Sequence, residues 1–240
     1  MDSWAKQVKA AGAKPTGAEV RNAATVALLR DGANGLEVLM GKRATKMDFH
    51  GGAWVFPGGR IDDADWESAD GDIAHAARVA AARESMEEAG VSVAHLELVH
   101  FSNWLTPSIS PKRFATWFFA GRAGADHADA KADGVESDAV RWFEPHIALA
   151  ERAKGEIELA PPQFVTLLML SRHEKVDQAL AAMRADDPID FQPSIVFPEA
   201  GGAIALYAED HAYDNHDLVE MPGPRHRLFM GNDGWLYERS

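Results

Sequence analysis

The segment from Asp72 to Gly90, DIAHAARVAAARESMEEAG, is the part of the sequence that most restricts the fold. It is rich in alanine, the residue with the highest intrinsic helix propensity. Asp72 is a favourable N-cap, because its carboxylate can accept a hydrogen bond from an unpaired backbone N–H of the first turn. Gly90 readily adopts the left-handed conformation that ends many helices. The segment therefore predicts an α-helix over residues 73–89.

The C-terminal end of this predicted helix carries an unusual charge pattern. Glu84 precedes Glu87 and Glu88 by three and four residues, so all three share one broad face, with Arg83 one turn before Glu87. Like charges at this spacing repel by roughly 0.2–0.5 kcal/mol per pair, and the helix dipole disfavours anions at this end. One interpretation is a solvated acidic face. A site for Mg²⁺ or Mn²⁺ explains both features, because these ions bind carboxylate oxygens and bridge them to substrate phosphates.

The other predicted elements indicate a domain in which helices pack on a sheet. Besides the helix at 73–89, we expect strands at 24–31, 36–43, 54–59, 93–105, 113–123 and 140–144, loops at 60–71 and 127–139, and helices at 145–155 and within 161–185. The first two strands form a predicted hairpin, and the strand at 54–59 is expected to end at Pro57 and two glycines. This order of elements favours a mixed α/β or α+β fold.

We divide the chain into three parts. Residues 1–20 form a polar lead-in that ends near Pro15 and Gly17, and residues 21–185 form the core domain. Residues 186–240 are rich in proline and glycine and include a predicted hairpin, HRLFM-GNDG-WLYER. We expect this last part to be an extension that packs on the core or on a second subunit, which leaves a homodimer open.

Composition restricts the partners and the compartment. The 240 residues carry a formal net charge of −13, which repels phosphate backbones, so we expect no nucleic-acid partner. There are no cysteines, which excludes disulfides and thiolate metal sites. No apolar run is long enough to span a bilayer, and the N-terminal residues lack the apolar core of a signal peptide. We therefore expect no membrane partner and a cytoplasmic location.

Together, the glutamate pattern and the FPGG turn before it resemble a known family signature. The Nudix hydrolase family has the pattern GX5EX7REUXEEXGU, in which U is apolar. The stretch RESMEEAGV matches it at Arg83, Glu84, Glu87, Glu88, Gly90 and Val91, and FPGG occupies residues 56–59. The resemblance implies an α/β (α+β) fold, a Nudix-type α/β/α sandwich with a mixed β-sheet between helices.

The sequence departs from this signature before Arg83. Twenty-three residues, 60–82, separate Gly59 from Arg83, which is ten more than in the family pattern. The first glutamate of the signature has no clear counterpart: standard spacing back from Arg83 reaches His75, and spacing forward from Gly59 reaches Asp65, with Glu67 nearby. Ser85 occupies a slot that is usually Leu, Val or Thr.

The long insert resembles a Nudix subgroup that includes a mammalian coenzyme A diphosphatase and its bacterial relatives. The upstream stretch GKRATKMDFHGGAWVFPGG also resembles the motif of this subgroup, although Ala44 replaces a usual serine. The matching positions are Arg43, Met47, His50, Gly52 and Phe56 to Gly59.

The family resemblance implies roles for individual residues. Arg83 would orient a neighbouring glutamate, and Glu84 would bind metal or activate the attacking water. The implied catalytic residues are Glu84, Arg83 and Glu87, and the implied metal ligands are Glu84, Glu87, Glu88, the Gly59 carbonyl and Glu136, with Asp138 as the alternative to Glu136.

Candidate substrate-binding residues come from other segments. Arg43 and Arg113 are cations that can pair with phosphates, or surface charges without a role. His50 can bind substrate or hold the turn before Gly51. Trp104 and Phe114 can stack on a base, although aromatic residues on strands usually belong to the core.

The expected function is metal-dependent hydrolysis of a diphosphate linkage in a nucleoside diphosphate derivative, with Mg²⁺ or Mn²⁺ as cofactor. Coenzyme A or an acyl-CoA is the first expected substrate. The alternatives are ADP-ribose, NADH or another dinucleotide, or a non-catalytic module that senses a nucleotide. The complete set of Arg83, Glu84, Glu87 and Glu88 argues against the non-catalytic alternative.

Overall fold

A computed structural model describes residues 15–45, 51–135, 137–199, 201–231 and 233–240. The chain divides into two compact units. The sheet unit comprises Arg21–Asn103 and Thr116–Ile189, and the C-terminal unit comprises Met1–Val20, Trp104–Ala115 and Asp190–Ser240. The assignment of residues 186–240 as an extension of the core stays a prediction.

The sheet unit is built around an eight-stranded sheet, of which six strands follow the order β3-β2-β1-β6-β5-β8. The two remaining strands are β4, which pairs with β1, and β7, which pairs with β2. The strands are β1 (Val20–Asp31), β2 (Leu36–Arg43), β3 (Trp54–Val55), β4 (Gly58–Arg60), β5 (Val99–Leu105), β6 (Arg113–Arg122), β7 (Ser137–Phe143) and β8 (Ile189–Phe191).

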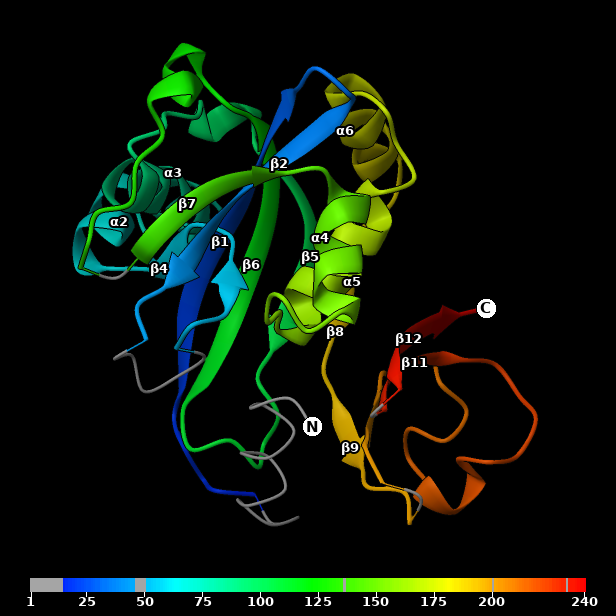
Figure 1. Ribbon diagram of the computed structural model, residues 1–240. Coiled ribbons are helices and arrows are strands. Elements are labelled where there is room, and N and C mark those ends of the chain that lie inside the picture. Colours follow the sequence, from blue (N-terminus) through cyan, green and yellow to red (C-terminus); the bar gives the residue numbers. More distant parts are fainter. Residues whose placement is uncertain (1–14, 46–50, 136, 200, 232) are drawn as a thin grey trace. The chain divides into compact units, whose positions relative to one another are not determined.

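Helices cover both faces of this sheet, with α2 and α3 on one side and α4 and α5 on the other (Figure 1). They are α2 (Asp63–Ser68), α3 (Ile73–Ala89), α4 (Pro145–Ala153), α5 (Pro161–Leu170) and α6 (Val176–Ala185), with short 3-10 helices at η1 (His95–Glu97) and η2 (Ala125–Asp129). The predicted α/β/α sandwich is confirmed. Among the described residues, no helix combines the length and the apolar character needed to cross a membrane.

Helix α3 spans the predicted residues, and both of its predicted caps are present. The Asp72 carboxylate accepts a hydrogen bond from the His75 N–H at 2.8 Å, and Gly90 ends the helix with a φ of 66°. The helix packs on the sheet through four buried alanines, Ala76, Ala77, Ala80 and Ala81. Because alanine side chains are short, they allow the α3 backbone to approach the sheet closely.

The structure corrects two predictions between Trp54 and Gly71. The predicted strand does not end at the glycines, because Gly58–Arg60 resumes pairing with β1 as strand β4. The predicted loop at 60–71 contains helix α2, whose first turn is stabilised when the Asp62 N–H donates to Asp65 Oδ2 at 2.9 Å. A six-residue acidic helix is too short to show an apolar periodicity, so its sequence is typical of a loop.

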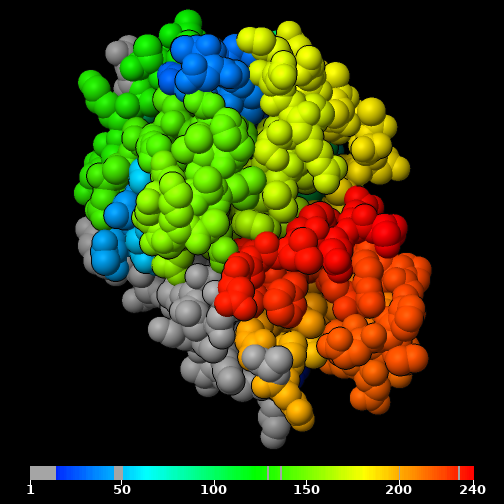
Figure 2. Space-filling model, turned by 45° about the vertical axis from the view of Figure 1, so that its right-hand side comes forward, coloured from blue at the N-terminus to red at the C-terminus, as the bar shows by residue number. Residues whose placement is uncertain are grey.

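The C-terminal unit contains a four-stranded antiparallel sheet in the order β12-β11-β10-β9. The strands are β9 (Ser194–Val196), β10 (Ala203–Leu206), β11 (His226–Gly231) and β12 (Gly234–Arg239), and η3 (His216–Leu218) precedes β11. The predicted hairpin is therefore confirmed as β11 and β12. Figure 2 shows this hairpin, in red, at the surface of the molecule.

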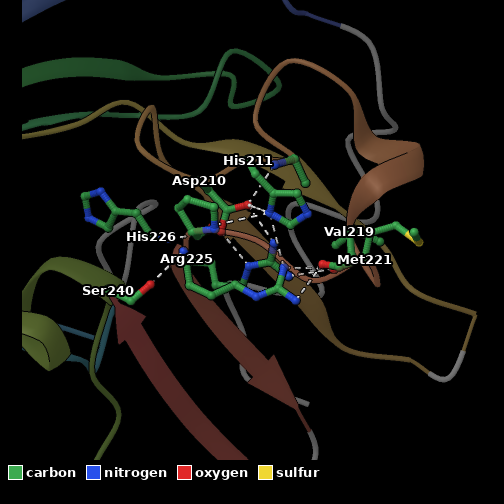
Figure 3. Close-up of polar contacts among 10 residues, drawn as sticks. Asp210, His211, Val219, Met221, Arg225, His226 and Ser240 are labelled. Atoms are coloured by element: carbon green, nitrogen blue, oxygen red, sulfur yellow. Dashed lines mark hydrogen bonds and ion pairs between the residues drawn. The ribbon is translucent and has the colours of Figure 1, made fainter.

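A buried ion pair holds the long connection between β10 and β11. Arg227 donates to both carboxylate oxygens of Asp210 at 2.6 Å, and the Asp210 side chain has no exposed surface. The neighbouring Arg225 donates to the carbonyl oxygens of Val219 at 3.4 Å and Met221 at 2.8 Å (Figure 3). Burial acts to raise the pKa of Asp210, but hydrogen bonds from Arg227 and from backbone N–H groups outweigh it and lower this pKa to about 2.

His226 is buried in the same unit, with 1% of its surface exposed. Its Nε2 lies 3.0 Å from the Tyr237 hydroxyl, and its ring contacts those of Phe191 and Tyr207. Burial lowers the pKa of His226 from 6.5 to about 4, although the nearby carboxylates of Glu209 and Asp210 act in the opposite direction. The imidazole is therefore neutral in the folded protein near pH 7.

The buried His226 makes the stability of the C-terminal unit depend on pH. The unfolded chain takes up this proton near pH 6.5, whereas the folded protein does so near pH 4. The contribution of the neutral His226 side chain to the free energy of unfolding is therefore fully present above pH 6.5 and is lost as the pH falls to 4. We expect the free energy of unfolding to decrease by about 3 kcal/mol across this window.

Urea unfolding at a series of pH values measures this dependence. His226→Phe should remove most of the slope between pH 6.5 and 4, because phenylalanine does not titrate. His146→Gln is the control, since the His146 side chain is 65% exposed, and it should leave the slope unchanged. An equal slope in wild type and His226→Phe would show that His226 is not its source.

Candidate functional site

The candidate site lies in the sheet unit, where the C-terminal half of α3 packs beside β4. The Gly58 N–H donates to Glu88 Oε2 at 3.0 Å, and Glu88 is only 8% exposed. A Cβ atom at Gly59 would lie 2.6 Å from the Glu84 carboxyl carbon. The absence of a side chain at Gly59 therefore leaves room for the Glu84 carboxylate beside the strand backbone.

Arg83 connects the acidic groups at this end of α3. Its Nη1 donates to Glu84 Oε1 at 2.8 Å and to Glu87 Oε2 at 2.9 Å. Its Nη2 donates to the Arg60 carbonyl oxygen at 3.1 Å, which ties the helix to β4. Hydrogen bonds to Asp65 and Glu84 raise the pKa of Arg83 above its usual value, so this side chain carries a permanent positive charge.

Asp65 is the third acidic residue that accepts hydrogen bonds from Arg83. Its two oxygens accept from Arg83 Nε at 3.1 Å and from Nη2 at 2.9 Å, and only 1% of the residue is exposed. Asp65 is the residue that the forward spacing from Gly59 reached in the sequence. His75, which the backward spacing reached, stacks instead on His95, with ring centroids 5.8 Å apart.

Ser85 explains one departure from the usual pattern. Its side chain is buried on α3, and its hydroxyl donates to the Val91 carbonyl oxygen just beyond the helix. The hydroxyl therefore pairs with the backbone at the helix end, at a position where an apolar side chain is usual.

The described acidic side chains are not arranged around a common point, as the ligands of a metal ion are. Within the described ranges, no three His, Cys, Asp or Glu side chains are gathered as they would be around a metal ion. Glu84 and Glu87 instead share Arg83 Nη1, which stands as a positive group between their carboxylates. Carboxylate oxygens are nevertheless the donors that Mg²⁺ and Mn²⁺ prefer, so the chemistry of this donor set fits such an ion.

The other sequence candidates in the sheet unit have contacts of their own or lie outside the described residues. Arg43 ends β2, and its Nε is buried without a hydrogen-bond partner among the described residues. Asp138 accepts a hydrogen bond from the Thr45 N–H at 3.2 Å. His50 and Glu136 lie outside the described residues.

Three aromatic or cationic candidates belong to the C-terminal unit. Trp104 is 6% exposed, and its ring stacks on Phe191 with centroids 3.9 Å apart. Arg113 Nε donates to the Thr106 carbonyl oxygen at 3.3 Å, and the Phe114 N–H donates to Thr106 Oγ1 at 3.1 Å. Their roles in substrate binding stay predictions.

Two groups of the site, the Gly58 N–H and the Asp65 carboxylate, could not be singled out from the sequence. Gly58 binds Glu88 through its backbone N–H, and a backbone group carries no signal in a residue pattern. Asp65 was one of several candidates for the missing glutamate, and its spacing from Gly59 was the signal that pointed to it.

Comparisons with known proteins identify the family to which this chain is similar. Residues 20–163 match the NUDIX domain. A NUDIX hydrolase from Alicyclobacillus acidocaldarius is structurally similar, with a TM-score of 0.62, 26% identity, and coverage of 69% of this chain and 97% of that chain. A MutT NUDIX hydrolase from Burkholderia pseudomallei has a TM-score of 0.46, 16% identity, and coverage of 63% and 98%.

A comparison with curated proteins finds no significant match. The NUDIX domain match nevertheless spans more than half of the chain, and it includes Asp65, β4 and all of α3. The protein therefore belongs to the NUDIX family and is a Nudix-type pyrophosphohydrolase.

Proposed function

We propose that this enzyme hydrolyses the diphosphate linkage of a nucleoside diphosphate derivative, and that Glu84, Glu87 and Glu88 hold the divalent metal ion the reaction needs. The observation that carries the proposal is the arrangement of these glutamates: Glu84 and Glu87 share Arg83, Glu88 binds the Gly58 N–H, and Glu84 packs against Gly59. One guanidinium at this end of α3 faces the charge of several carboxylates, so the cluster stays negative and attracts a cation.

The ligands of the ion would be Glu84, Glu87 and Glu88, with the Gly59 carbonyl as a further candidate. When bound, Mg²⁺ or Mn²⁺ neutralises the diphosphate charge and lowers the pKa of a coordinated water. Glu88 is already oriented by the Gly58 N–H. Asp65 would take the role of the first glutamate of the family signature, because it fixes the Arg83 guanidinium through two hydrogen bonds.

The reaction itself needs one proton acceptor. A water oxygen attacks one phosphorus of the diphosphate, the bond from that phosphorus to the bridging oxygen breaks, and two phosphate products leave. Glu84 can accept the proton of this water, or it can serve as a further metal ligand. Its side chain is 13% exposed, which leaves access to the reacting groups while restricting bulk water.

For the substrate, we propose coenzyme A or an acyl-CoA. The support is the resemblance of residues 43–59 to the motif of coenzyme A diphosphatases. Arg43 lies at the end of β2, and its buried Nε has no hydrogen-bond partner among the described residues, so this cation lacks a compensating group that a phosphate could supply. ADP-ribose, NADH and other dinucleotides are the competing substrates, since residues outside the glutamate helix select the group attached to the diphosphate.

A substrate panel tests this choice. With Mg²⁺, coenzyme A should yield 3′,5′-ADP and 4′-phosphopantetheine, identified by mass spectrometry, whereas ADP-ribose and NADH should react more slowly. EDTA should abolish turnover in every case, and added Mg²⁺ or Mn²⁺ should restore it. Absence of both coenzyme A products would refute this substrate, and turnover in EDTA would refute the metal-dependent mechanism.

Replacement of Glu87 tests the ligand assignment. Glu87→Gln should lower kcat/KM by about 100-fold or more, because a neutral amide binds the ion weakly and stabilises less transition-state charge. Its side chain is 58% exposed, so thermal stability should change little. Glu97→Gln, an exposed acid on η1, is the matched control and should retain wild-type activity. Full activity of Glu87→Gln would remove this residue from the site.

The two glycines of β4 should respond differently to alanine. At Gly58, the new Cβ would lie 2.5 Å from the Ala24 carbonyl oxygen and 2.6 Å from Thr25 Cα, which are backbone atoms, so Gly58→Ala should lose about 1–3 kcal/mol of stability. At Gly59, the Cβ meets the movable Glu84 carboxylate. Gly59→Ala should therefore stay folded in thermal melts but lose at least about 10-fold in activity. Equal activity of Gly59→Ala and wild type would contradict the placement of Glu84.

A further inference from the structure

The guanidinium of Arg83 has two edges with different surroundings. The edge formed by Nε and Nη2 makes paired hydrogen bonds with the buried Asp65 carboxylate. The Nη1 edge donates to Glu84 and Glu87 at 2.8 and 2.9 Å. Because the Glu87 side chain is 58% exposed, water and ions reach one of the two carboxylates that this second edge binds. One edge is therefore held inside the protein, and the other is open to exchange.

A competing cation can displace the contacts of one edge more easily than those of the other. Loss of the pair with Asp65 would leave a buried carboxylate without its cation, which is strongly destabilising. An ion pair with an exposed partner such as Glu87 contributes little and is screened by salt. A second cation that approaches the glutamates therefore displaces Nη1 and leaves the contact with Asp65 in place.

We propose that Arg83 competes with the divalent metal ion for Glu84 and Glu87. In the metal-free enzyme, Nη1 holds the two carboxylates together against their mutual repulsion. Metal binding releases Nη1, while Asp65 keeps the guanidinium beside the site. This inference rests on the proposed function, because it assumes that these glutamates bind the ion. Arg83 is then a positioning residue that keeps the site assembled but weakens its affinity for metal.

Side-chain ¹⁵N NMR of Arg83 in the wild-type protein tests the exchange directly. During titration with Mg²⁺ in the absence of substrate, the Nη1 protons should lose their protection and rotation about the Cζ–Nη1 bond should accelerate. The Nε–H signal should stay protected, since its acceptor, Asp65, is buried. If Mg²⁺ binds at the glutamates while the Nη1 signals stay unchanged, the competition is wrong.

A double variant measures how strongly Arg83 competes. Asp65→Asn/Arg83→Gln removes one charge of each sign, so the net charge is unchanged and no unpaired buried carboxylate remains. Isothermal titration with Mn²⁺ should give a dissociation constant about five- to ten-fold lower than in wild type, because the ion no longer displaces an ion pair. If Arg83 only oriented the glutamates, the same variant would bind Mn²⁺ more weakly.

Arg141→Gln/Glu151→Gln is the matched control. It removes an ion pair elsewhere in the sheet unit, in which Arg141 donates two hydrogen bonds to the Glu151 carboxylate at 2.9 and 2.7 Å. This variant should leave the Mn²⁺ affinity unchanged. A wild-type protein that binds neither Mg²⁺ nor Mn²⁺ would contradict the proposed function itself. If the wild-type protein binds the metal ion and the Asp65/Arg83 variant binds it with equal or lower affinity, the competition is refuted while the proposed function still stands. If that variant does not fold, the NMR titration of wild type decides.

Discussion

The ion pair between Arg83 and Asp65 is the interaction on which the candidate site depends. Asp65 is almost fully buried, and a buried carboxylate is tolerated when a cation and hydrogen bonds compensate its lost hydration. Arg83 supplies both, so α2 and α3 are fixed to each other at this point. The same contact fixes the direction of the remaining guanidinium edge, which reaches Glu84 and Glu87.

A second constraint is the close approach of α3 to the sheet. Buried alanines on the inner face of the helix bring its backbone near β1, and the absence of a side chain at Gly59 leaves room for Glu84 beside β4. As a result, Glu88 reaches the Gly58 N–H, and Glu84 packs at Gly59. The alanine-rich composition of α3 and the glycine at position 59 are thus parts of one arrangement, because both allow glutamate side chains of the helix to lie close to the strand.

Local signals in the sequence predicted the bounds of an element correctly where the residues at its ends determine them. Asp72 and Gly90 define the ends of α3, and β2 spans the predicted residues. Helix α2 was missed because its six residues carry an acidic pattern, while its stability depends on the contact of Asp65 with a residue 18 positions later. The choice between His75 and Asp65 likewise required the tertiary contact, since both satisfied one spacing of the family signature.

The position of the glutamates at the C-terminal end of α3 remains unfavourable even in the folded structure. Arg83 offsets their repulsion only in part, because one edge of its guanidinium is already engaged by Asp65. The partner that would relieve more of this repulsion is a cation that fits between carboxylates and leaves open positions for a diphosphate, which a guanidinium cannot do. An arginine that offsets the charge of the glutamates only in part therefore supports the proposal that a metal ion binds there.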